Sequence, residues 1–310
     1  MKNDIKQTSS KHVNPFKEPE DAAVQPAGPS PIDLAALAFV KQLGAELQKG
    51  EFDLPPFPDT AVKVRECIQD PAADNRALAA IIAKEPALAA RLMRMANSAM
   101  VRRGPIEVTD IPTAISRVGM TMVQNAATSF AAREAFKVPP GSACFGELNE
   151  LRRMSVRVAS IAYLLAKNVR SVSKPDEAML AGLLSSVGKF YIFTKASDHP
   201  DLFTDRAALR ALLNQWHTGV ARAIVEAWEF PDTIAIAVDE QEVKDKNRID
   251  AADLSDLLLV ANIIARAGVD AAKQLGDLDS LARMRMDAGK LHTLLTEHQE
   301  EIESMVSAMT

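Results

Sequence analysis

The stretch from Glu85 to Ala99, EPALAARLMRMANSA, decides the fold class of this 310-residue chain. Pro86 fits the first turn of a helix, where its missing N–H is harmless. The apolar residues that follow recur at helical spacing on one stripe, namely Leu88, Leu92, Met95 and Met100. The stretch therefore predicts an amphipathic helix, and the same periodicity continues on both sides of it.

Upstream, the apolar spacing predicts one helix over Ile32–Gln48, and the prolines of Leu54–Pro58 exclude a helix there because each restrains its predecessor to extended backbone. Asp59 is predicted to cap a helix over 60–69, and a further helix covers 75–83. Downstream, residues 102–105 form a turn, and Thr109 and Asp110 open a helix with Pro112 in its first turn.

The second half of the chain follows the same pattern after a break at Pro139–Gly141. Helices are predicted along the stripe Leu151–Leu165 and over 176–195, 209–213, 217–228, 233–243, 251–267 and 288–309. No alternating run exceeds about five residues, so the sequence predicts an all-α protein. The break near 138–146 is the one internal boundary that the pattern supports.

Four regions follow from these observations. Residues 1–30 are rich in proline and poor in apolar residues, which predicts a disordered tail because such a segment cannot offset its ordering entropy. Residues 31–140 form an N-terminal helical sub-domain that packs on a second helical sub-domain over 141–270. Residues 271–310 form a C-terminal helical extension.

Composition excludes several classes of protein. The net charge of −5 argues against a general nucleic-acid-binding protein. The two cysteines, Cys67 and Cys144, make no CxxC pair and are predicted to be free thiols of a reducing compartment. The N-terminus lacks the apolar core of a secretory signal, and the longest stretch free of charged residues, 118–132, is too short and polar to span a bilayer. A cytoplasmic location is expected.

One glycine-rich segment, Gly182-Leu-Leu-Ser-Ser-Val-Gly-Lys189, superficially matches a phosphate-binding loop. It has one residue too many between its glycines, Phe190 replaces the metal-binding hydroxyl, and its surroundings are helical rather than strand-like. We interpret Lys189 as a solvated or helix-end cation instead.

Three motifs in order carry a resemblance to a known family. They are Leu54-Pro-Pro-Phe-Pro58, the stretch Glu85–Ala99, and Val108-Thr-Asp-Ile-Pro-Thr-Ala-Ile115 followed by Val118-Gly119. Together they resemble the HDOD family, the HD-related output domains of bacterial signalling proteins, over about residues 50–270. The resemblance implies a multi-helix fold whose second sub-domain is a degenerate relative of the HD-superfamily metal-dependent phosphohydrolases. It also implies that Asn97 and Ser98 help to end their helix through side-chain hydrogen bonds.

The resemblance places the metal-ligand pattern of the active HD enzymes on seven positions of this chain. His217 is the one histidine among them, and it precedes Trp228 and Pro231 as the family pattern requires. The other four histidines of the chain lie elsewhere. The seven positions are Met154, Ser185, Ser186, His217, Asp239, Glu240 and Asn262.

This set of side chains is a poor one for metal chemistry. Hydrolysis of a phosphoester with divalent ions needs imidazoles and carboxylates that converge on the metal and lower the pKa of a bound water. Serine hydroxyls and an amide supply no charge, and a thioether is a soft ligand. We therefore expect no metal, no cofactor and no catalysis. His217 is interpreted first as a capping or packing residue at a helix start, with a residual ligand or anion contact as the alternative.

Arg91, Arg94, Arg102 and Arg103 form the most basic cluster in the sequence. Arg91 and Arg94 share one helix face at i and i+3, so a patch for an acidic partner, a nucleotide or nucleic acid is one interpretation. No aromatic residue is interleaved to stack bases, so a solvated helical face is preferred.

The sequence thus predicts a non-catalytic, cytoplasmic bacterial signalling module that acts through protein partners of unknown identity, with a small ligand between the sub-domains as an open alternative. A membrane role is not expected, and nucleic acid is not the expected partner. The rival hypothesis is a divergent HD-type phosphohydrolase acting on a nucleotide or cyclic dinucleotide.

Overall fold

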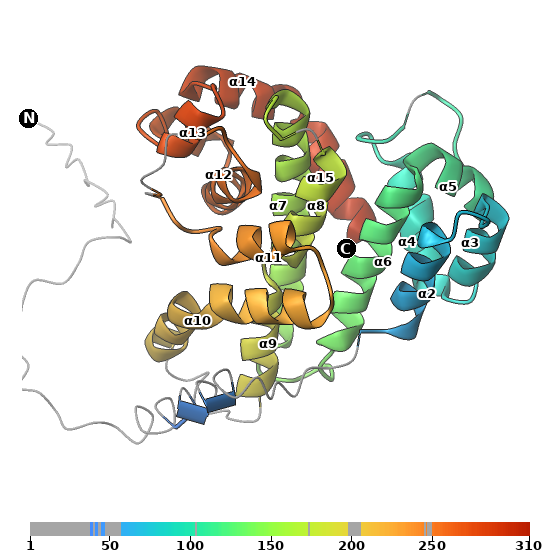
Figure 1. The fold of residues 1–310 in the computed structure, drawn as a ribbon, viewed down its shortest axis with the longest axis horizontal. Coiled ribbons are helices and arrows are strands. Elements are labelled where there is room, and N and C mark those ends of the chain that lie inside the picture. Colours follow the sequence, from blue (N-terminus) through green and yellow to red (C-terminus); the bar gives the residue numbers. More distant parts are fainter. Residues whose placement is uncertain are drawn as a thin grey trace, which may run out of the picture.

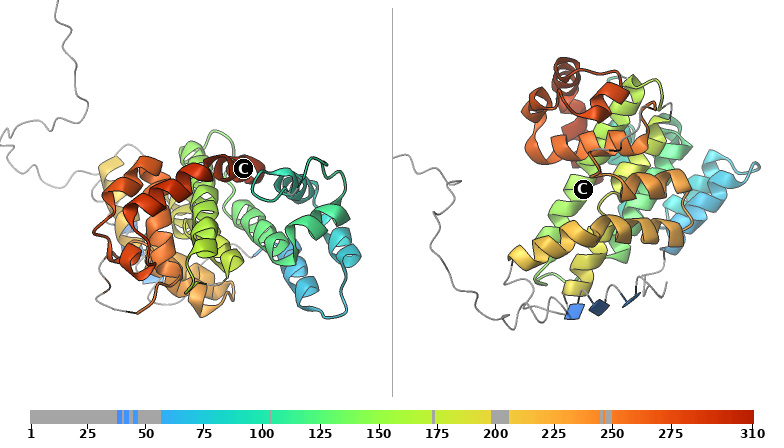
Figure 2. Two further views of the ribbon diagram at one scale, coloured as in Figure 1. Left: turned by 90° about the horizontal axis from the view of Figure 1, so that it is seen from above. Right: turned by 60° about the vertical axis from the view of Figure 1, so that its left-hand side comes forward.

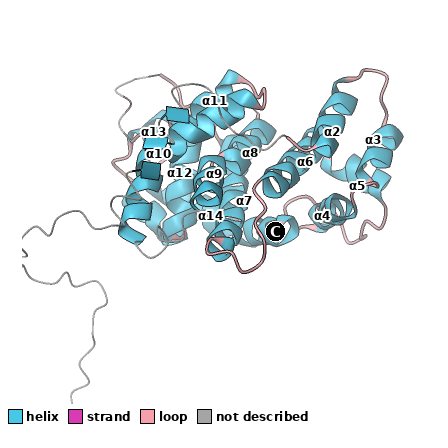
Figure 3. Ribbon diagram, turned by 90° about the horizontal axis from the view of Figure 1, so that it is seen from below, coloured by secondary structure: helices cyan, strands magenta, loops and turns pink. Residues whose placement is uncertain are grey.

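The structure is a computed structural model that describes residues 38–39, 41–42, 45–46, 57–102, 104–172, 174–197, 206–244, 246 and 250–310. Every regular element in these residues is a helix and none is a strand, which confirms the all-α prediction (Figure 3). The proposed tail over 1–30, most of Leu54–Pro58 and much of the expected helix over Ile32–Gln48 lie outside the described residues.

The N-terminal group of helices lies at one side of the molecule (Figure 1). Local signals set its boundaries: Asp74 and Asp110 each accept backbone hydrogen bonds as N-caps, and Pro86 stands in the first turn of its helix. Gly119, with φ of 86°, makes the turn between the last two helices. The group consists of α2 (Asp59–Gln69), α3 (Asn75–Ile82), α4 (Pro86–Asn97), α5 (Ile111–Val118) and α6 (Met120–Ala135).

The end of α4 behaves as the sequence predicts. The Ser98 hydroxyl donates to the Met95 carbonyl at 2.7 Å. The Asn97 amide donates to the Val108 carbonyl at 3.0 Å and its oxygen accepts from the Val108 N–H at 2.8 Å. These bonds end the helix and attach the following loop to it.

The second group begins with the long helix α7 (Phe145–Asn168) and fills the rest of the molecule. Its helices are α8 (Pro175–Leu184), α9 (Val187–Ala196), α10 (Arg206–Ala227), α11 (Asp232–Asp239), α12 (Leu254–Ala267), α13 (Asp279–Arg283), α14 (Ala288–Glu297) and α15 (Gln299–Met309), with a 3₁₀ helix η2 at Val269–Gln274. A buried apolar cluster joins these helices, and a second cluster joins α2–α6 to parts of α7, α8 and α15.

Two glycines allow pairs of helices in the second group to approach closely. A Cβ atom on Gly182 of α8 would lie 2.4 Å from the Cα of Ala159 on α7. A Cβ atom on Gly188 of α9 would lie 2.0 Å from the His217 carbonyl oxygen of α10. Only glycine fits at these positions, so both are requirements of packing rather than of a phosphate-binding loop.

The last helix, α15, lies between the two groups (Figure 2). It contacts α7 and α4. Its apolar face, which includes Met305 and Met309, belongs to the N-terminal apolar cluster. The Ser304 hydroxyl accepts from the Ala99 N–H at 2.8 Å, and Arg157 of α7 pairs with Glu303 at 2.7 Å. The C-terminal residues therefore complete the core of a group far away in sequence.

Several helix boundaries differ from the sequence prediction. The expected helix over 176–195 is two helices, because Ser185 and Ser186 interrupt it, and the helix over 288–309 is interrupted at His298. The expected helices over 209–213 and 217–228 are one continuous helix, α10, so His217 lies in a helix interior and not at a helix start. Asp59 is the first residue of α2 and Pro58 occupies the cap position.

Within the described residues, no helix is long and apolar enough to cross a membrane.

Candidate functional site

The seven positions inferred from the HD pattern lie on helices of the second group that pack against one another. Met154 is on α7, Ser185 and Ser186 form the junction of α8 and α9, His217 is on α10, and Asn262 is on α12. Asp239 is the last residue of α11, and Glu240 follows it. Ser185, Ser186, His217 and Asn262 are buried, whereas Met154 is half-buried against the apolar cluster.

A buried amide network connects the serine junction to α12. The Gln241 side-chain amide donates to the Ser185 carbonyl at 2.9 Å and to the Val238 carbonyl at 2.7 Å, and its oxygen accepts from the Asn262 amide at 3.1 Å. Asn262 also donates to the Leu258 carbonyl at 3.0 Å. Gln241 is 1% exposed, so these bonds form away from water. The sequence reasoning missed Gln241.

Glu242 is the carboxylate that faces His217. Its Oε1 atom lies 3.2 Å from His217 Nε2, 2.6 Å from Arg266 Nη2 and 3.6 Å from Lys189 Nζ. The His217 contact, together with Arg266 and Lys189, holds the pKa of Glu242 far below its usual range although burial acts in the opposite direction, so Glu242 stays ionised. We call these four residues, Lys189, His217, Glu242 and Arg266, the Glu242 cluster.

His217 is fully buried and stays neutral at physiological pH. Burial lowers its pKa, the Lys189 and Arg266 charges lower it further, and the Glu242 carboxylate opposes this without reversing it. Its Nδ1 atom has no hydrogen-bond partner among the described residues, and its Nε2 atom is not aligned for a hydrogen bond at the 3.2 Å contact. His217 is therefore a buried neutral imidazole whose Nδ1 atom has no hydrogen-bond partner among the described residues.

Lys189 differs from the interpretation as a solvated cation. Its side chain is 16% exposed, and it packs beside Glu242. Burial and the Arg266 charge lower its pKa to about 8, although Glu242 acts in the opposite direction. Lys189 lies on α9, next to the close approach of α9 to α10 at Gly188.

Asp239 and Glu240 point to other partners. Asp239 pairs with Arg222 of α10 at 3.1 Å on the surface. Glu240 lies 3.0 Å from Lys246 and accepts from the Ser255 hydroxyl at 3.3 Å. The expected pair is thus not brought to His217, and Glu242, two residues further along, occupies that place.

These residues do not fit a divalent metal ion. Beside His217 they offer one carboxylate that already contacts two cations, two serine oxygens, amides that are already bonded and a thioether. A metal ion would also lie next to Lys189 and Arg266, which repel it. In the part of the chain that the structure describes, no group of three or more His, Cys, Asp or Glu residues is placed to hold a metal.

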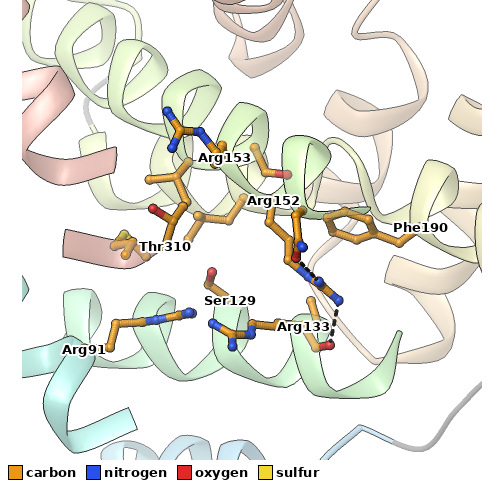
Figure 4. A pocket seen from close by; sticks show the side chains of 13 residues that line it. Arg91, Ser129, Arg133, Arg152, Arg153, Phe190 and Thr310 are labelled. Atoms are coloured by element: carbon orange, nitrogen blue, oxygen red, sulfur yellow. Dashed lines mark hydrogen bonds between the residues drawn. The ribbon is translucent and has the colours of Figure 1, made fainter. Parts of the chain in front are cut away.

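The arginine cluster expected from the sequence does not form as one surface patch. Arg94 donates to the Ala308 carbonyl at 3.0 Å, and Arg102 donates to the carbonyls of Gly104 and Pro105. Arg103 lies outside the described residues. Arg91 is 3% exposed and lines a cavity with Arg133, Arg152 and Arg153, which come from α6 and α7 (Figure 4). The i, i+3 spacing of Arg91 and Arg94 on α4 does not predict that Arg91 lies beside arginines of α6 and α7.

Comparison with known proteins supports the fold assignment. The HDOD domain family matches residues 54–243. One similar solved structure is a protein of Shewanella amazonensis whose name proposes a metal-dependent phosphohydrolase. The two structures superpose with a TM-score of 0.71 at 24% sequence identity, and the match covers 89% of this chain and 99% of the Shewanella chain. A Marinobacter aquaeolei structure, whose name proposes a signal transduction protein, has a TM-score of 0.60 and 19% identity and covers 88% of this chain and 66% of its own.

Among curated proteins, an uncharacterized protein of Treponema pallidum is 22% identical over 205 residues. The match spans 62% of this chain and 38% of that relative. At these identities the solved structures establish a shared helical fold.

Proposed function

Since this chain belongs to the HDOD family, we propose that it is a non-catalytic signalling module of the bacterial cytoplasm that acts through contacts with protein partners. The Marinobacter relative, whose name proposes signal transduction, supports the regulatory role. In this proposal, partner proteins bind to the surface of the module, and the helices of the HD-like region serve as a packed scaffold. Residues 31–140, 141–270 and 271–310 are the three proposed structural parts of this module.

The observation that carries the proposal is the arrangement around His217. Where an HD enzyme needs several charged or imidazole ligands that converge, this chain places the Gln241 amide network and a carboxylate neutralised by Lys189 and Arg266. Activation of a bound water requires a strongly polarising metal. These side chains cannot supply its coordination sphere.

The surface offers one feature suited to a protein contact. Ile106 is 76% exposed, the highest exposure of any large apolar side chain that the structure describes. Its loop is held in place: Arg117 donates to the Ile106 carbonyl at 3.0 Å, and Asn97 makes two bonds to Val108. An apolar side chain on a well-held loop loses little entropy when a partner covers it.

A divergent phosphohydrolase is the second candidate, because the Nδ1 atom of His217 has no hydrogen-bond partner among the described residues and the Shewanella relative is named for that activity. The two functions are separated by metal analysis of the purified full chain and by turnover assays on a panel of nucleotides and cyclic dinucleotides. We expect no turnover that depends on His217. Stoichiometric metal together with turnover that is lost in His217→Gln and kept in Asp239→Asn, whose side chain faces Arg222, would overturn the proposal.

The partner contact is tested by affinity capture from a native bacterial lysate with the tagged full chain. We expect stoichiometric partners that are retained by Val243→Lys, a control at a less exposed apolar position, and lost with Ile106→Lys. Failure to capture any partner across growth conditions would contradict a role through protein contacts. Capture that is insensitive to Ile106→Lys would instead exclude this loop as the contact.

A further inference from the structure

The cavity that Arg91 lines lies where the two groups of helices meet, and its volume is about 330 Å³. Its walls come from α4, α6, α7, α8, α9 and the end of α15 (Figure 4). None of the seven positions inferred from the HD pattern lines it. The lining residues are Arg91, Ser129, Ala132, Arg133, Asn149, Arg152, Arg153, Ser155, Val156, Leu183, Phe190, Met309 and Thr310.

The charge of this cavity is one-sided. Four arginines line it, and no aspartate or glutamate does. The nearest ion pairs are long ones at its margin, with Arg133 Nε 4.0 Å from Glu134 and Arg153 Nε 3.9 Å from Glu150. These margin carboxylates belong to half-buried or exposed side chains and leave the interior positive.

Arg91 is the most informative of the four arginines. It is 97% buried, and its guanidinium makes no hydrogen bond or ion pair with any other described residue. Burial, Arg133 and Arg94 lower its pKa to about 10, so it remains protonated at neutral pH. A buried charge without a counterion is strongly unfavourable, and native proteins rarely keep one unless something compensates it.

Arg152 is held in position by the protein itself. Its guanidinium donates to Asn149 Oδ1 at 2.8 Å and to the Phe136 carbonyl at 3.2 Å. Its Nε atom is buried and has no partner. Desolvation and the Arg133 charge lower its pKa, as expected for cations that face one another across a cavity. The cavity wall thus contains the fixed cation Arg152 in addition to the unpaired Arg91.

We propose that this arginine-lined cavity binds a small phosphate-bearing anion. A guanidinium group can donate two parallel hydrogen bonds to the oxygens of one phosphate group. Four guanidinium groups around one cavity suit an anion with more than one negative charge. The volume is near the lower end of small-molecule pockets, about 300–1,000 Å³, so the ligand is no larger than about a mononucleotide. Phe190, Leu183 and Val156 supply an apolar wall for its organic part.

The location of the cavity gives the anion a structural effect. Arg91 and Arg133 belong to the N-terminal group of helices, whereas Arg152 and Arg153 belong to α7. An anion bound among them neutralises the repulsion between these cations and fastens the two groups together. That this anion is the signal that the module responds to rests on the proposed function; binding itself does not.

The test is calorimetric titration of the purified full chain at low salt with inorganic phosphate, a nucleoside 5′-monophosphate, the corresponding uncharged nucleoside and succinate as a dicarboxylate. We expect the two phosphate probes to bind one site, the nucleoside not to bind, and succinate to bind at least tenfold more weakly than the monophosphate. Binding weakens as salt increases.

Three variants assign the site. Arg91→Met is expected to weaken phosphate binding at least tenfold while raising the melting temperature of the ligand-free protein, because it removes an unpaired buried charge. If Arg91 only stabilised the fold, Arg91→Met would instead lower the melting temperature of the ligand-free protein. Arg133→Met, at a position whose side chain is 44% exposed, is expected to weaken binding in the same way. Arg170→Met, at an exposed position after α7 and outside the cavity, is expected to leave binding unchanged.

Absence of binding by every phosphate probe at millimolar concentration would overturn the proposal, as would binding that Arg91→Met and Arg133→Met leave unaltered. Tighter binding of succinate than of the phosphates would also overturn it. These results concern the purified chain alone, so they are independent of whether a protein partner is captured.

Discussion

Gly188→Ala tests whether the close approach of α9 and α10 supports the candidate site. The added Cβ atom would lie 2.0 Å from the His217 carbonyl oxygen and 2.7 Å from the Ala221 backbone nitrogen. Ordinary contact begins at 3.4 Å, so the first of these distances is 1.4 Å too short. Both clashing atoms belong to the backbone of a helix interior and cannot rotate away.

Relief of this clash requires α9 and α10 to separate by about 1 Å, and such a gap forfeits about a quarter to a half of each dispersion contact along the interface. Overpacking of a core typically costs about 1–3 kcal/mol. Because two backbone atoms resist the added methyl group, we expect a loss near the upper end, about 3 kcal/mol of the free energy of unfolding.

The assay is urea denaturation of the full chain, compared with Gly219→Ala as a matched control. Gly219 lies on α10 itself, and a Cβ atom there meets nothing within 4 Å. Alanine is favoured over glycine inside a helix by about 1 kcal/mol, so the control is expected to be more stable than the parent chain. If Gly188→Ala unfolds at the same urea concentration as the parent or a higher one, the close packing of α9 on α10 is refuted.

Three further predictions concern the Glu242 cluster and its neighbours, all measured by urea denaturation. The folded chain lowers the pKa of Lys189 from its ordinary value of 10.5 to about 8, so the unfolded chain binds more protons between these two pH values. The free energy of unfolding is therefore expected to rise with pH across this window, by at most about 3 kcal/mol, and Lys189→Met is expected to abolish the rise. A pH dependence that is the same in both proteins would contradict the burial of this cation. Glu242→Gln leaves the largely buried Lys189 without its carboxylate and is expected to cost about 2 kcal/mol. Asp239→Asn, at a surface pair with Arg222, is expected to change stability by less than about 1 kcal/mol, and equal effects would show that Glu242 is no more than another surface charge. Gln241→Met removes a buried donor from the Ser185 carbonyl and is expected to cost about 2 kcal/mol, and a neutral result would exclude the amide network as a support of the serine junction.

Local chemistry made most helices predictable. Asp110 caps α5 and Pro86 stands in the first turn of α4 as the sequence indicates, because these signals act within one turn of helix. The interruption at Ser185 and Ser186 was not predictable from apolar spacing, since the residues on both sides are buried and the apolar run continues through it. Close helix contacts at Gly182 and Gly188 lie on the two sides of that break.

The site could be predicted in position but not in composition. The family pattern led to His217 and Asn262, which the structure buries in one region. It also led to Asp239 and Glu240, which lie within the helix that the sequence predicts over 233–243. Because α11 ends at Asp239, the chain turns there and brings Gln241 and Glu242 inward instead. The helix ends four residues earlier than predicted, and apolar spacing does not place helix ends more exactly than this.

Arg91 shows a different limit of sequence reasoning. Its spacing from Arg94 correctly indicates neighbouring positions on one helix. The two side chains nevertheless have different surroundings, because Arg94 donates a hydrogen bond to the end of α15 whereas Arg91 lines the cavity beside α6 and α7. The partners that decide this, Arg133 and Arg152, lie more than forty residues away in sequence. Helix propensity and local residue spacing do not predict contacts between residues that are distant in sequence.

Three consecutive residues of α9 connect the two polar sites of the molecule. Gly188 fixes the distance to α10, Lys189 reaches Glu242, and Phe190 forms part of the wall of the arginine-lined cavity. Because these residues share one rigid turn of helix, α9 cannot move relative to α10 without altering both Lys189 and the cavity wall. The proposed anion, by restraining the cavity wall at Phe190, would therefore also restrain Lys189 and the Glu242 cluster through α9.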